Sequence, residues 1–395
     1  MPRGSINHLD HLLRDWGWLN RTHSKFTIRT RGYRLVTMPE VLPAVDSVED
    51  LPKHENGALL WLEPRQSLHD LRPPKVALGE HATYAVDYYR KEFAPRQDRP
   101  FIAHFRKPLI YGRHFSILDS QHHVFKECIR LDRRWKAGVP KRGAGVEKSA
   151  LHVPGTYLQA CSEFHAHYAH HFCDIVPKLK LYEDAGLLHK VPALLHEMSK
   201  PLSDASFHVL GLDTPDSRRW DDSCWRLDGL YFASDFKKFC SWTPESAKWV
   251  RAKFSPGLDQ RKAGSKLFYI ARRHGSRQAM NEDAILDAIK PWGFTVIEPE
   301  KYSIREQIEL FAQAGAIIGP QGAGIQNCLW SPPGCKVLEF ISPRYFSGVY
   351  WTLTESVGQE YGLVTGQTDP NEDPISAGST WDPALITQAL DVLLK

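Results

Sequence analysis

The chain has 395 residues, of which 42% are hydrophobic and 24% are charged, and its formal charge at pH 7 is +4. This length suggests two or three domains with ordinary buried cores, and the small net charge disfavours a nucleic-acid-binding protein. No window approaches 18 uninterrupted apolar residues, the first 20 residues lack a signal-type apolar stretch, and the seven scattered cysteines form no CxxC pair, so we expect a reduced, cytoplasmic protein.

The first half of the chain predicts an irregular start followed by an α/β lobe. Residues 1–90 contain many prolines and show no sustained period, so we interpret them as an irregular N-terminal extension. Residues 91–254 contain short β-like runs between helical segments, which indicates an N-terminal α/β lobe with an antiparallel or irregular entrance. Residues 255–266 are rich in Gly, Ser and Lys, and we interpret them as the linker to a second domain.

A basic segment lies inside this first lobe, over residues 130–148. It contains seven Lys or Arg residues against two acidic ones, interrupted by glycines and a proline. Two interpretations remain open: a loop that binds anionic lipid headgroups or an anionic glycan, and a solvated loop with no binding role. The first would bring the protein to the periphery of the inner membrane.

The second half predicts a doubly wound parallel sheet. Short apolar runs at 267–271, 294–297, 316–319 and 336–340 alternate with helical segments. Asn281 is placed to cap one helix, and Ser303 with Glu306 forms the capping box of the next. This alternation over residues 267–362 is typical of a Rossmann-like lobe. We expect residues 363–395 to form a linker and a C-terminal helix that packs back toward the N-terminal lobe.

Several candidate ligand-binding residues fall at the carboxyl edge of this predicted sheet, where open parallel sheets bind ligands. Arg272 and Arg273 follow the first strand, and Glu339 lies near the end of the fourth. The turn after the third strand contains Gly319, Gly322 and Gly324. Backbone N–H groups of such a turn and the arginines suit a diphosphate, and a strand-end carboxylate suits both hydroxyls of a ribose. These features together indicate a nucleoside diphosphate site.

The segment 165–187 predicts a helix that is kinked at Pro177. His170 and Asp174 are four residues apart and therefore share one face of it, an arrangement that suits a general base. Four histidines also raise the possibility of a metal site: His165, His167, His170 and His171. No glutamate follows them as in HExxH, no cysteine pair is near, and the chain has no Asp-x-Asp motif, so we expect no metal and no cofactor.

Two sets of spaced residues form recognisable signatures between residues 155 and 360. The first consists of Tyr168, His170, Asp174, Pro177, Lys178 and Leu179. The second comprises Tyr269, Ile270, Arg272, Arg273, Asn281, Glu282, Asp283, Glu306, Gln307, Gly319, Pro320, Gly322, Ala323, Gly324, Asn327, Pro332, Pro333, Gly334, Val337 and Glu339. Together they resemble glycosyltransferase family 61, which includes eukaryotic protein O-GlcNAc transferases, plant xylosyl or arabinosyl transferases and bacterial capsule-cluster proteins. The chain resembles a bacterial member of this family, of the capsular-polysaccharide type.

The resemblance implies a GT-B fold, with two Rossmann-like lobes facing a central cleft, and an inverting, metal-independent hexosyl- or pentosyltransferase. His170 or Asp174 would be the catalytic base, and the donor, expected to be UDP-linked, would contact Arg272, Arg273, Gly319, Gln321, Gly322, Ala323, Gly324, Asn327 and Glu339. The acceptor would be a glycan or lipid-linked glycan in surface or capsular polysaccharide biosynthesis.

Gln321 departs from the family pattern, because the family usually has histidine in this GPHGAG motif. Glutamine can hydrogen-bond a phosphate or a sugar hydroxyl, but it carries neither a proton nor a charge. A catalytically inactive GT-B scaffold of a polysaccharide assembly complex is therefore the alternative function. A dinucleotide oxidoreductase is disfavoured, since the glycine-rich turn follows the third strand of its lobe and not the first.

Overall fold

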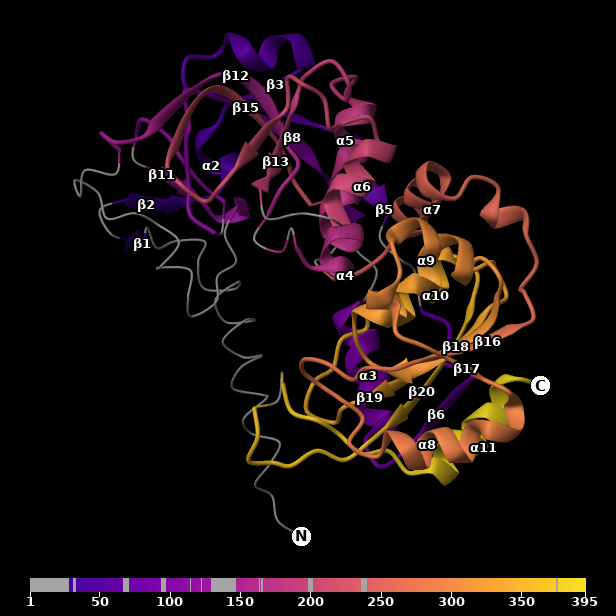
Figure 1. The fold of residues 1–395 in the computed structure, drawn as a ribbon. Helices are drawn as coiled ribbons and strands as arrows, with labels where there is room; N and C mark the ends of the chain where they lie inside the picture. The colour runs from indigo at the N-terminus through magenta and orange to yellow at the C-terminus, as the bar shows by residue number, and fades with distance from the viewer. Residues whose placement is uncertain are drawn as a thin grey trace. The chain divides into compact units, whose positions relative to one another are not determined.

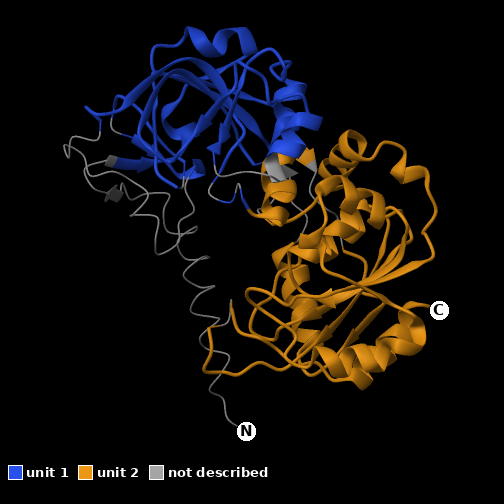
Figure 2. Cartoon of the chain, in the orientation of Figure 1, with its two compact units in different colours: residues 1–64, 99–166, 178–236 blue, residues 65–98, 167–177, 237–395 orange. Residues whose placement is uncertain are grey.

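The computed structural model describes residues 28–30, 33–66, 71–93, 97–113, 115–121, 123–128, 147–162, 164, 166–197, 202–235, 240–373 and 376–395. Most of the basic segment 130–148 and His165 lie outside these residues. The chain forms two compact units: unit 1 comprises residues 1–64, 99–166 and 178–236, and unit 2 comprises residues 65–98, 167–177 and 237–395 (Figure 2). No helix in the described part of the chain has the length and apolar character needed to cross a membrane.

Unit 1 is built on one mixed sheet (Figure 1). Its strands are β1 (Ile28–Thr30), β2 (Tyr33–Val36), β3 (Ala44–Val45), β4 (Ala58–Trp61), β8 (Phe101–Arg106), β9 (Leu109–Tyr111), β10 (Ser116–Leu118), β11 (His123–Phe125), β12 (Leu151–Gln159), β13 (Ala193–His196), β14 (Arg218–Trp220) and β15 (Trp225–Ala233). Its helices are α2 (Met38–Val41), α5 (Leu179–Asp184) and α6 (Leu202–Val209), with 3₁₀ turns at Val48–Lys53 and Lys126–Cys128.

The sheet of unit 1 changes character at β15. On one side β15, β12, β13 and β14 run parallel, and on the other side β8 and β9 pair antiparallel with β15. A large apolar cluster that includes Phe105, Phe125, Trp220, Leu227 and Leu230 packs against this sheet. The mixed α/β character agrees with the expected lobe that has an antiparallel entrance.

Unit 2 contains a six-stranded sheet in the order β17-β16-β18-β19-β20-β6, and every neighbouring pair is parallel. The strands are β6 (Val76–Leu78), β16 (Lys266–Ile270), β17 (Thr295–Ile297), β18 (Ala314–Pro320), β19 (Lys336–Ile341) and β20 (Glu360–Thr365), and a separate pair is formed by β5 (Arg65–Gln66) and β7 (Gln97–Asp98). The four strands β16 to β19 correspond to the four apolar runs identified in the sequence. The doubly wound parallel sheet is therefore present as expected.

Helices cover both faces of this sheet. They are α3 (Ala82–Glu92), α4 (Tyr168–His170), α7 (Pro244–Phe254), α8 (Glu282–Ile289), α9 (Ile304–Phe311), α10 (Val349–Ser356) and α11 (Pro383–Leu393), together with 3₁₀ segments at Leu258–Gln260, Lys290–Trp292, Pro299–Lys301 and Ala323–Trp330. In Figure 1, α8 and α11 lie on one face, and α9 and α10 lie on the other. The capping box of α9 is formed as predicted, by Ser303 and Glu306.

The structure differs from the expected organisation in three places. Residues 1–90, interpreted as irregular extension, supply the edge strand β6 and all but the last two residues of helix α3 of unit 2. Residues 255–266, interpreted as a linker, lie inside unit 2, where Leu258 is buried and Gly264 hydrogen-bonds Ala314. Helix α11 packs on α8, β19, β20 and β6 of unit 2, and not toward the N-terminal lobe. These segments pack on parts of unit 2 that are distant from them in the sequence, and local sequence patterns do not show such contacts.

The short segment 167–177 also belongs to unit 2, although the sequence suggested that it lies in the N-terminal lobe. Aromatic contacts hold this segment on the rest of unit 2. The Phe172 ring meets the rings of Trp330 and Phe254 edge-on, at centroid distances of 5.2 and 5.4 Å. The Tyr168 hydroxyl accepts a 2.8 Å hydrogen bond from Trp330 Nε1 and donates a 2.8 Å bond to Asn327 Oδ1. Trp330 therefore holds α4 against the turn after β18.

Replacement of Trp330 by alanine is expected to lower the free energy of unfolding of unit 2 by about 3–5 kcal/mol, because a fully buried indole leaves a cavity and the Tyr168 hydroxyl loses a partner. Denaturant unfolding followed by circular dichroism measures this loss. As a control, Tyr302→Ala removes a ring that is 39% exposed and is expected to change stability by less than about 0.5 kcal/mol. Equal effects of the two substitutions would contradict the anchoring role.

Candidate functional site

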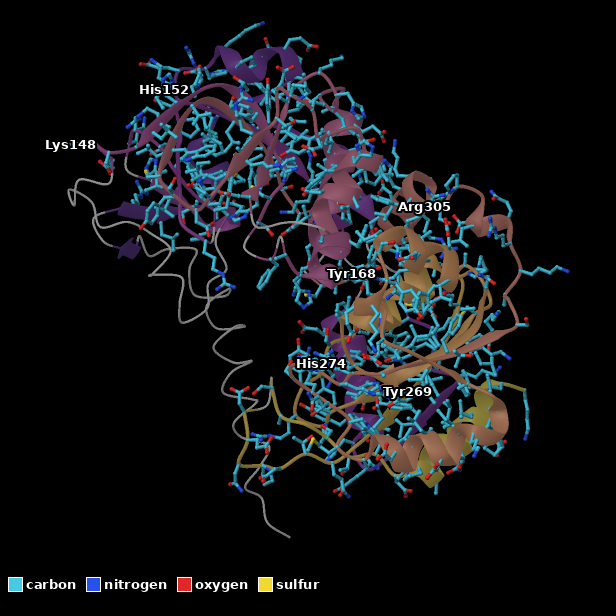
Figure 3. All side chains as sticks on the ribbon, viewed as in Figure 1. Lys148, His152, Tyr168, Tyr269, His274 and Arg305 are labelled. Atoms are coloured by element: carbon cyan, nitrogen blue, oxygen red, sulfur yellow. The ribbon has the colours of Figure 1, made fainter. Side chains whose placement is uncertain are left out.

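The carboxyl edge of the unit 2 sheet brings the predicted donor residues together. β16 ends at Ile270, β18 ends at Pro320, and these strands are hydrogen-bonded neighbours. The segment after β16 therefore meets the turn after β18. Figure 3 labels His274 of the first segment and Tyr168 of α4 among the side chains of unit 2.

Arg272 is the residue that joins these two segments. Its Nη1 donates a 3.1 Å hydrogen bond to the carbonyl oxygen of Gln321, and its Nε and Nη2 donate to the carbonyl and hydroxyl oxygens of Ser276. The guanidinium lies directly on Gly322, where a Cβ atom would stand 1.4 Å from Nη1. Gly322 has an extended backbone that any residue could adopt, so glycine is required here by the close approach of Arg272.

The charge of Arg272 is not balanced locally. No carboxylate in the described part of the chain lies within ion-pair distance of its guanidinium. Burial, and then the neighbouring charge of Arg277, lowers the pKa of Arg272, but a guanidinium remains protonated at neutral pH. Arg277 itself lies over the ring of Tyr345, 4.4 Å from its centroid. Two cations therefore gather at this edge, which is an arrangement that attracts an anion.

Arg273, the adjacent arginine, is oriented differently. Its Nε donates to Glu282 of α8 at 2.9 Å, and its Nη1 donates to Glu298 at 3.2 Å. These ion pairs hold the side chain away from the glycine-rich turn. The structure thus separates two arginines that the sequence treated alike, and it brings Arg272 alone of the two to the turn.

Glu339 was expected to hold a ribose, and the structure corrects this expectation. Its side chain is fully buried, and both carboxylate oxygens are engaged, one by Gln321 Nε2 at 2.8 Å and the other by the Tyr361 hydroxyl at 2.5 Å. Gln321 Nε2 also donates to the carbonyl of Ser347. Gln321 is itself buried, so these hydrogen bonds with Glu339 and Ser347 fix the orientation of its side chain.

The other residues of the turn make packing contacts and hydrogen bonds that account for the residue type at each position. A Cβ on Gly319 or Gly324 would come within about 2.6 Å of Ile270, so both glycines allow close packing on β16. Asn327 is buried and bonds Tyr168 and the carbonyl of Gly324. Ala323 is half-buried and begins the 3₁₀ helix, whose first N–H groups have no intrahelical acceptor. Gly322, Ala323 and Gly324 therefore offer backbone donors beside Arg272.

The two residues considered for the general base, His170 and Asp174, are hydrogen-bonded to each other on the segment 167–177. His170 Nδ1 and Asp174 Oδ2 are 2.8 Å apart, and Asp174 Oδ1 accepts a 3.0 Å hydrogen bond from the backbone of Cys240. Asp174 lies in a π-helical turn, His171–Ile175, of a kind that is frequent at functional sites. Burial and the charges of His170, Arg277 and Arg272 lower the pKa of His167 to about 4. His171, the other histidine of the i, i+4 spacing, is buried, and its ring meets that of Phe172 edge-on.

Sequence reasoning missed Cys240, Ser276 and Arg277, which complete these contacts. Cys240 Sγ lies 3.6 Å from His170 Nδ1. Ser276 and Arg277 follow Arg272 by four and five residues in a segment without a regular period, so no pattern marked them. Only the folded chain shows that they share this edge.

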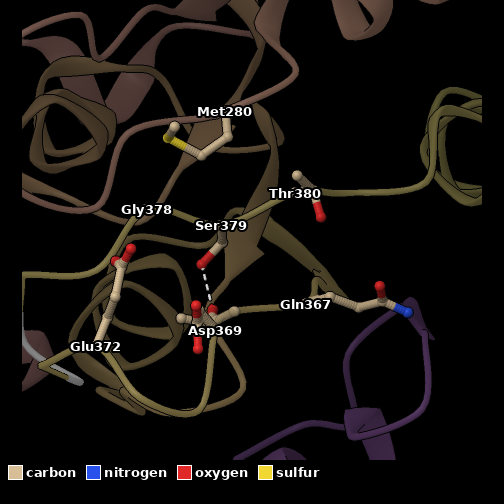
Figure 4. A pocket seen from close by; sticks show the side chains of 8 residues that line it. Met280, Gln367, Asp369, Glu372, Gly378, Ser379 and Thr380 are labelled. Carbon is tan, nitrogen blue, oxygen red and sulfur yellow. Dashed lines mark hydrogen bonds between the residues drawn. The ribbon is translucent and has the colours of Figure 1, made fainter.

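A cavity of about 420 Å³ lies between Met280 and the segment that follows β20, and neither Arg272 nor the glycines of the turn line it (Figure 4). It is lined by Met280, Gln367, Thr368, Asp369, Glu372, Gly378, Ser379 and Thr380. The carboxylates of Asp369 and Glu372 make it unsuited to a diphosphate. The anion-attracting part of the edge is therefore the turn, and not this cavity.

Residues 168–338 match the model of the family Glycosyltransferase 61. The matched region begins at Tyr168, includes the His170–Asp174 pair and the Arg272–Gly322 contact, and ends one residue before Glu339. The match covers less than half of the 395 residues, and it shows that this region of the chain is similar to glycosyltransferase family 61. Comparison with curated proteins finds no match for the chain.

Glu339 generates a prediction about pH. Burial raises its pKa from the ordinary value of 4.5 to about 7, although hydrogen bonds from Tyr361 and Gln321 oppose the rise. A raised folded-state pKa contributes stability that is present below pH 4.5 and is lost as pH rises through about 7. Relative to Glu339→Gln, the wild-type protein is expected to lose on the order of 3 kcal/mol between pH 4.5 and pH 8.

Denaturant unfolding of both proteins across this pH range measures the difference. Glu339→Asp keeps a titratable group and serves as the matched variant, so it should retain a pH dependence that Glu339→Gln lacks. Parallel stability curves for wild type and Glu339→Gln would show that the pKa of Glu339 is not raised in the folded protein.

Proposed function

We propose that the chain is an inverting, metal-independent glycosyltransferase that uses a nucleoside diphosphate sugar as its donor. The observation that carries the proposal is the Arg272 guanidinium, which is held on Gly322 at the carboxyl edge of a parallel sheet and has no carboxylate partner among the residues that the structure describes. A departing diphosphate supplies the missing negative charge. Because the cation is already in place before the reaction, it would stabilise the charge that develops on the leaving group.

His170 is the better candidate for the base, and Asp174 for the residue that positions it. Both oxygens of Asp174 are engaged, one by His170 Nδ1 and one by the Cys240 backbone, and its side chain is only 8% exposed. With a proton on Nδ1 donated to Asp174, the opposite nitrogen, Nε2, is the basic atom of the ring. It would accept the proton of the acceptor hydroxyl as that oxygen attacks the anomeric carbon and the nucleoside diphosphate leaves.

Several finer assignments belong to the same proposal. The GT-B class is supported by two compact units with separate sheets, each containing parallel strands. A UDP-linked donor, a glycan or lipid-linked glycan acceptor, and a role in capsular or surface polysaccharide biosynthesis rest on the family resemblance. Membrane contact through the basic segment and a cytoplasmic location stay predictions from sequence.

The donor half of the proposal is tested by binding of UDP. Gly322→Ala is expected to weaken UDP binding about tenfold to a hundredfold, because its methyl group displaces the Arg272 guanidinium, and Arg272→Ala should have a similar effect. Calorimetry measures the affinities. Arg305→Ala is the control, since Arg305, labelled in Figure 3, is 88% exposed and pairs with Glu309 on α9. Equal affinity in all four proteins would refute the assigned diphosphate position.

The chemical half is tested by transfer from UDP-sugars to a glycan acceptor. His170→Ala is expected to lower kcat by about a hundredfold to ten-thousandfold without weakening UDP binding, since it removes the base but not Arg272. Asp174→Asn should cause a smaller loss of kcat, because it disturbs only the orientation of the ring. His208→Ala changes an exposed histidine of unit 1 and serves as the control. Full activity of His170→Ala would exclude it as the base.

A catalytically inactive scaffold remains the competing function. It is suggested by Gln321, which stands where the family pattern usually has histidine. The intact contacts of Arg272 and the formed His170–Asp174 pair favour the enzyme. The same two assays separate the alternatives. A protein that binds UDP and transfers no sugar from any UDP-sugar, at any acceptor offered, would be the scaffold.

A further inference from the structure

We propose that His170, Asp174 and Cys240 form a binding site for a thiophilic divalent cation, Zn²⁺ above all. His170 Nδ1, Asp174 Oδ2 and Cys240 Sγ all lie within 4.8 Å of one another. Across the described ranges of the chain, no other three His, Cys, Asp or Glu residues bring their ligand atoms this close. The three side chains offer one imidazole nitrogen, one carboxylate oxygen and one sulfur.

The distances fit a tetrahedral zinc ion. With Zn–S near 2.3 Å and Zn–N and Zn–O near 2.0–2.1 Å, ligand atoms around zinc stand about 3.3–3.6 Å apart. The sulfur lies 3.6 Å from His170 Nδ1 and 3.9 Å from Asp174 Oδ2, and the nitrogen and oxygen are 2.8 Å apart. Small side-chain rotations would place a cation between them. Thiolate with imidazole selects zinc over magnesium or calcium, which prefer oxygen ligands.

The backbone holds the sulfur in place by an unusual conformation. Cys240 has a φ of +53°, a left-handed conformation that residues other than glycine rarely adopt. In this conformation its N–H donates to Asp174 Oδ1, which leaves Oδ2 directed to His170 and the sulfur. Such an outer hydrogen bond orients a carboxylate ligand in metal sites. Cys173, although adjacent to Asp174 in sequence, is turned to the carbonyl of Ser241 and takes no part.

Zinc bound here would have a regulatory consequence that rests on the proposed function. The metal would occupy His170 Nδ1 and Asp174 Oδ2, the two atoms whose hydrogen bond orients the proposed base. The ring proton would then stay on Nε2, and His170 could not accept a proton from the acceptor hydroxyl. Metal occupancy and sugar transfer would exclude each other, so zinc would act as an inhibitor of a transferase that needs no metal.

The site itself is tested with Co²⁺, which replaces zinc and has visible spectra. Titration of the chelator-treated full chain should produce one equivalent of tetrahedral d–d absorption and a thiolate-to-cobalt charge-transfer band, both removed by Zn²⁺. Cys240→Ser should lose the charge-transfer band, and Cys128→Ser, which changes another partly exposed free cysteine, should keep it. Asp174→Asn should weaken cobalt binding about tenfold to a hundredfold while the thiolate band remains.

Absence of the charge-transfer band in the wild-type protein, or its persistence in Cys240→Ser, would overturn the site. Circular dichroism of each variant excludes loss of folding as the cause. The transfer assay then tests the consequence: Zn²⁺ should inhibit the wild-type enzyme at concentrations that leave Cys240→Ser uninhibited. A protein that binds cobalt but transfers no sugar would retain the metal site and refute the proposed function, and an active protein without the cobalt band would do the reverse.

Discussion

The contact of the Arg272 guanidinium with Gly322 is the constraint on which the carboxyl edge of unit 2 depends. It ties the segment after β16 to the turn after β18 through the carbonyl of Gln321, and it is possible only where the turn has no side chain. The Gln321 side chain is in turn held from the other side by Glu339. The edge therefore keeps the positive charge of Arg272 in a fixed position, and no carboxylate of the described ranges pairs with it; a buried charge in this state is costly unless an anion binds.

The parts of the fold that could be predicted are those in which local pattern and burial agree. β16 to β19 are short apolar runs because both faces of a parallel sheet are covered, and the capping box of α9 is visible within the four residues from Ser303 to Glu306. β6 could not be predicted. It has only three residues, and its partner β20 lies more than 280 residues away, so nothing local to Val76 shows that it completes the sheet. The packing of α11 on β6, β19 and β20 could not be predicted for the same reason.

In the candidate site, too, local sequence patterns indicated some features and long-range contacts determine the others. Position at a strand end marked Arg272 and the turn glycines, and it marked Arg273 and Glu339 equally. What separates them is side-chain direction: Arg273 reaches Glu282 of α8 and Glu298, the residue after β17, whereas the side chain of Glu339 is buried. The spacing of His170 and Asp174 was sufficient to pair them. Cys240, 66 residues after Asp174, joins them only because its left-handed backbone turns its N–H and its sulfur to the same carboxylate.

Gln321 links these observations to the chemistry. Histidine at this position, as in the family pattern, could share a proton with Glu339 and carry positive charge at the turn. Glutamine offers Glu339 a neutral amide, so the carboxyl keeps the raised pKa that burial imposes. The turn then contributes backbone donors and no charge of its own, and Arg272 with Arg277 must neutralise a bound diphosphate. Dependence on the arginines should therefore be stronger in this chain than in a relative with histidine at the turn, where an imidazolium would share the task.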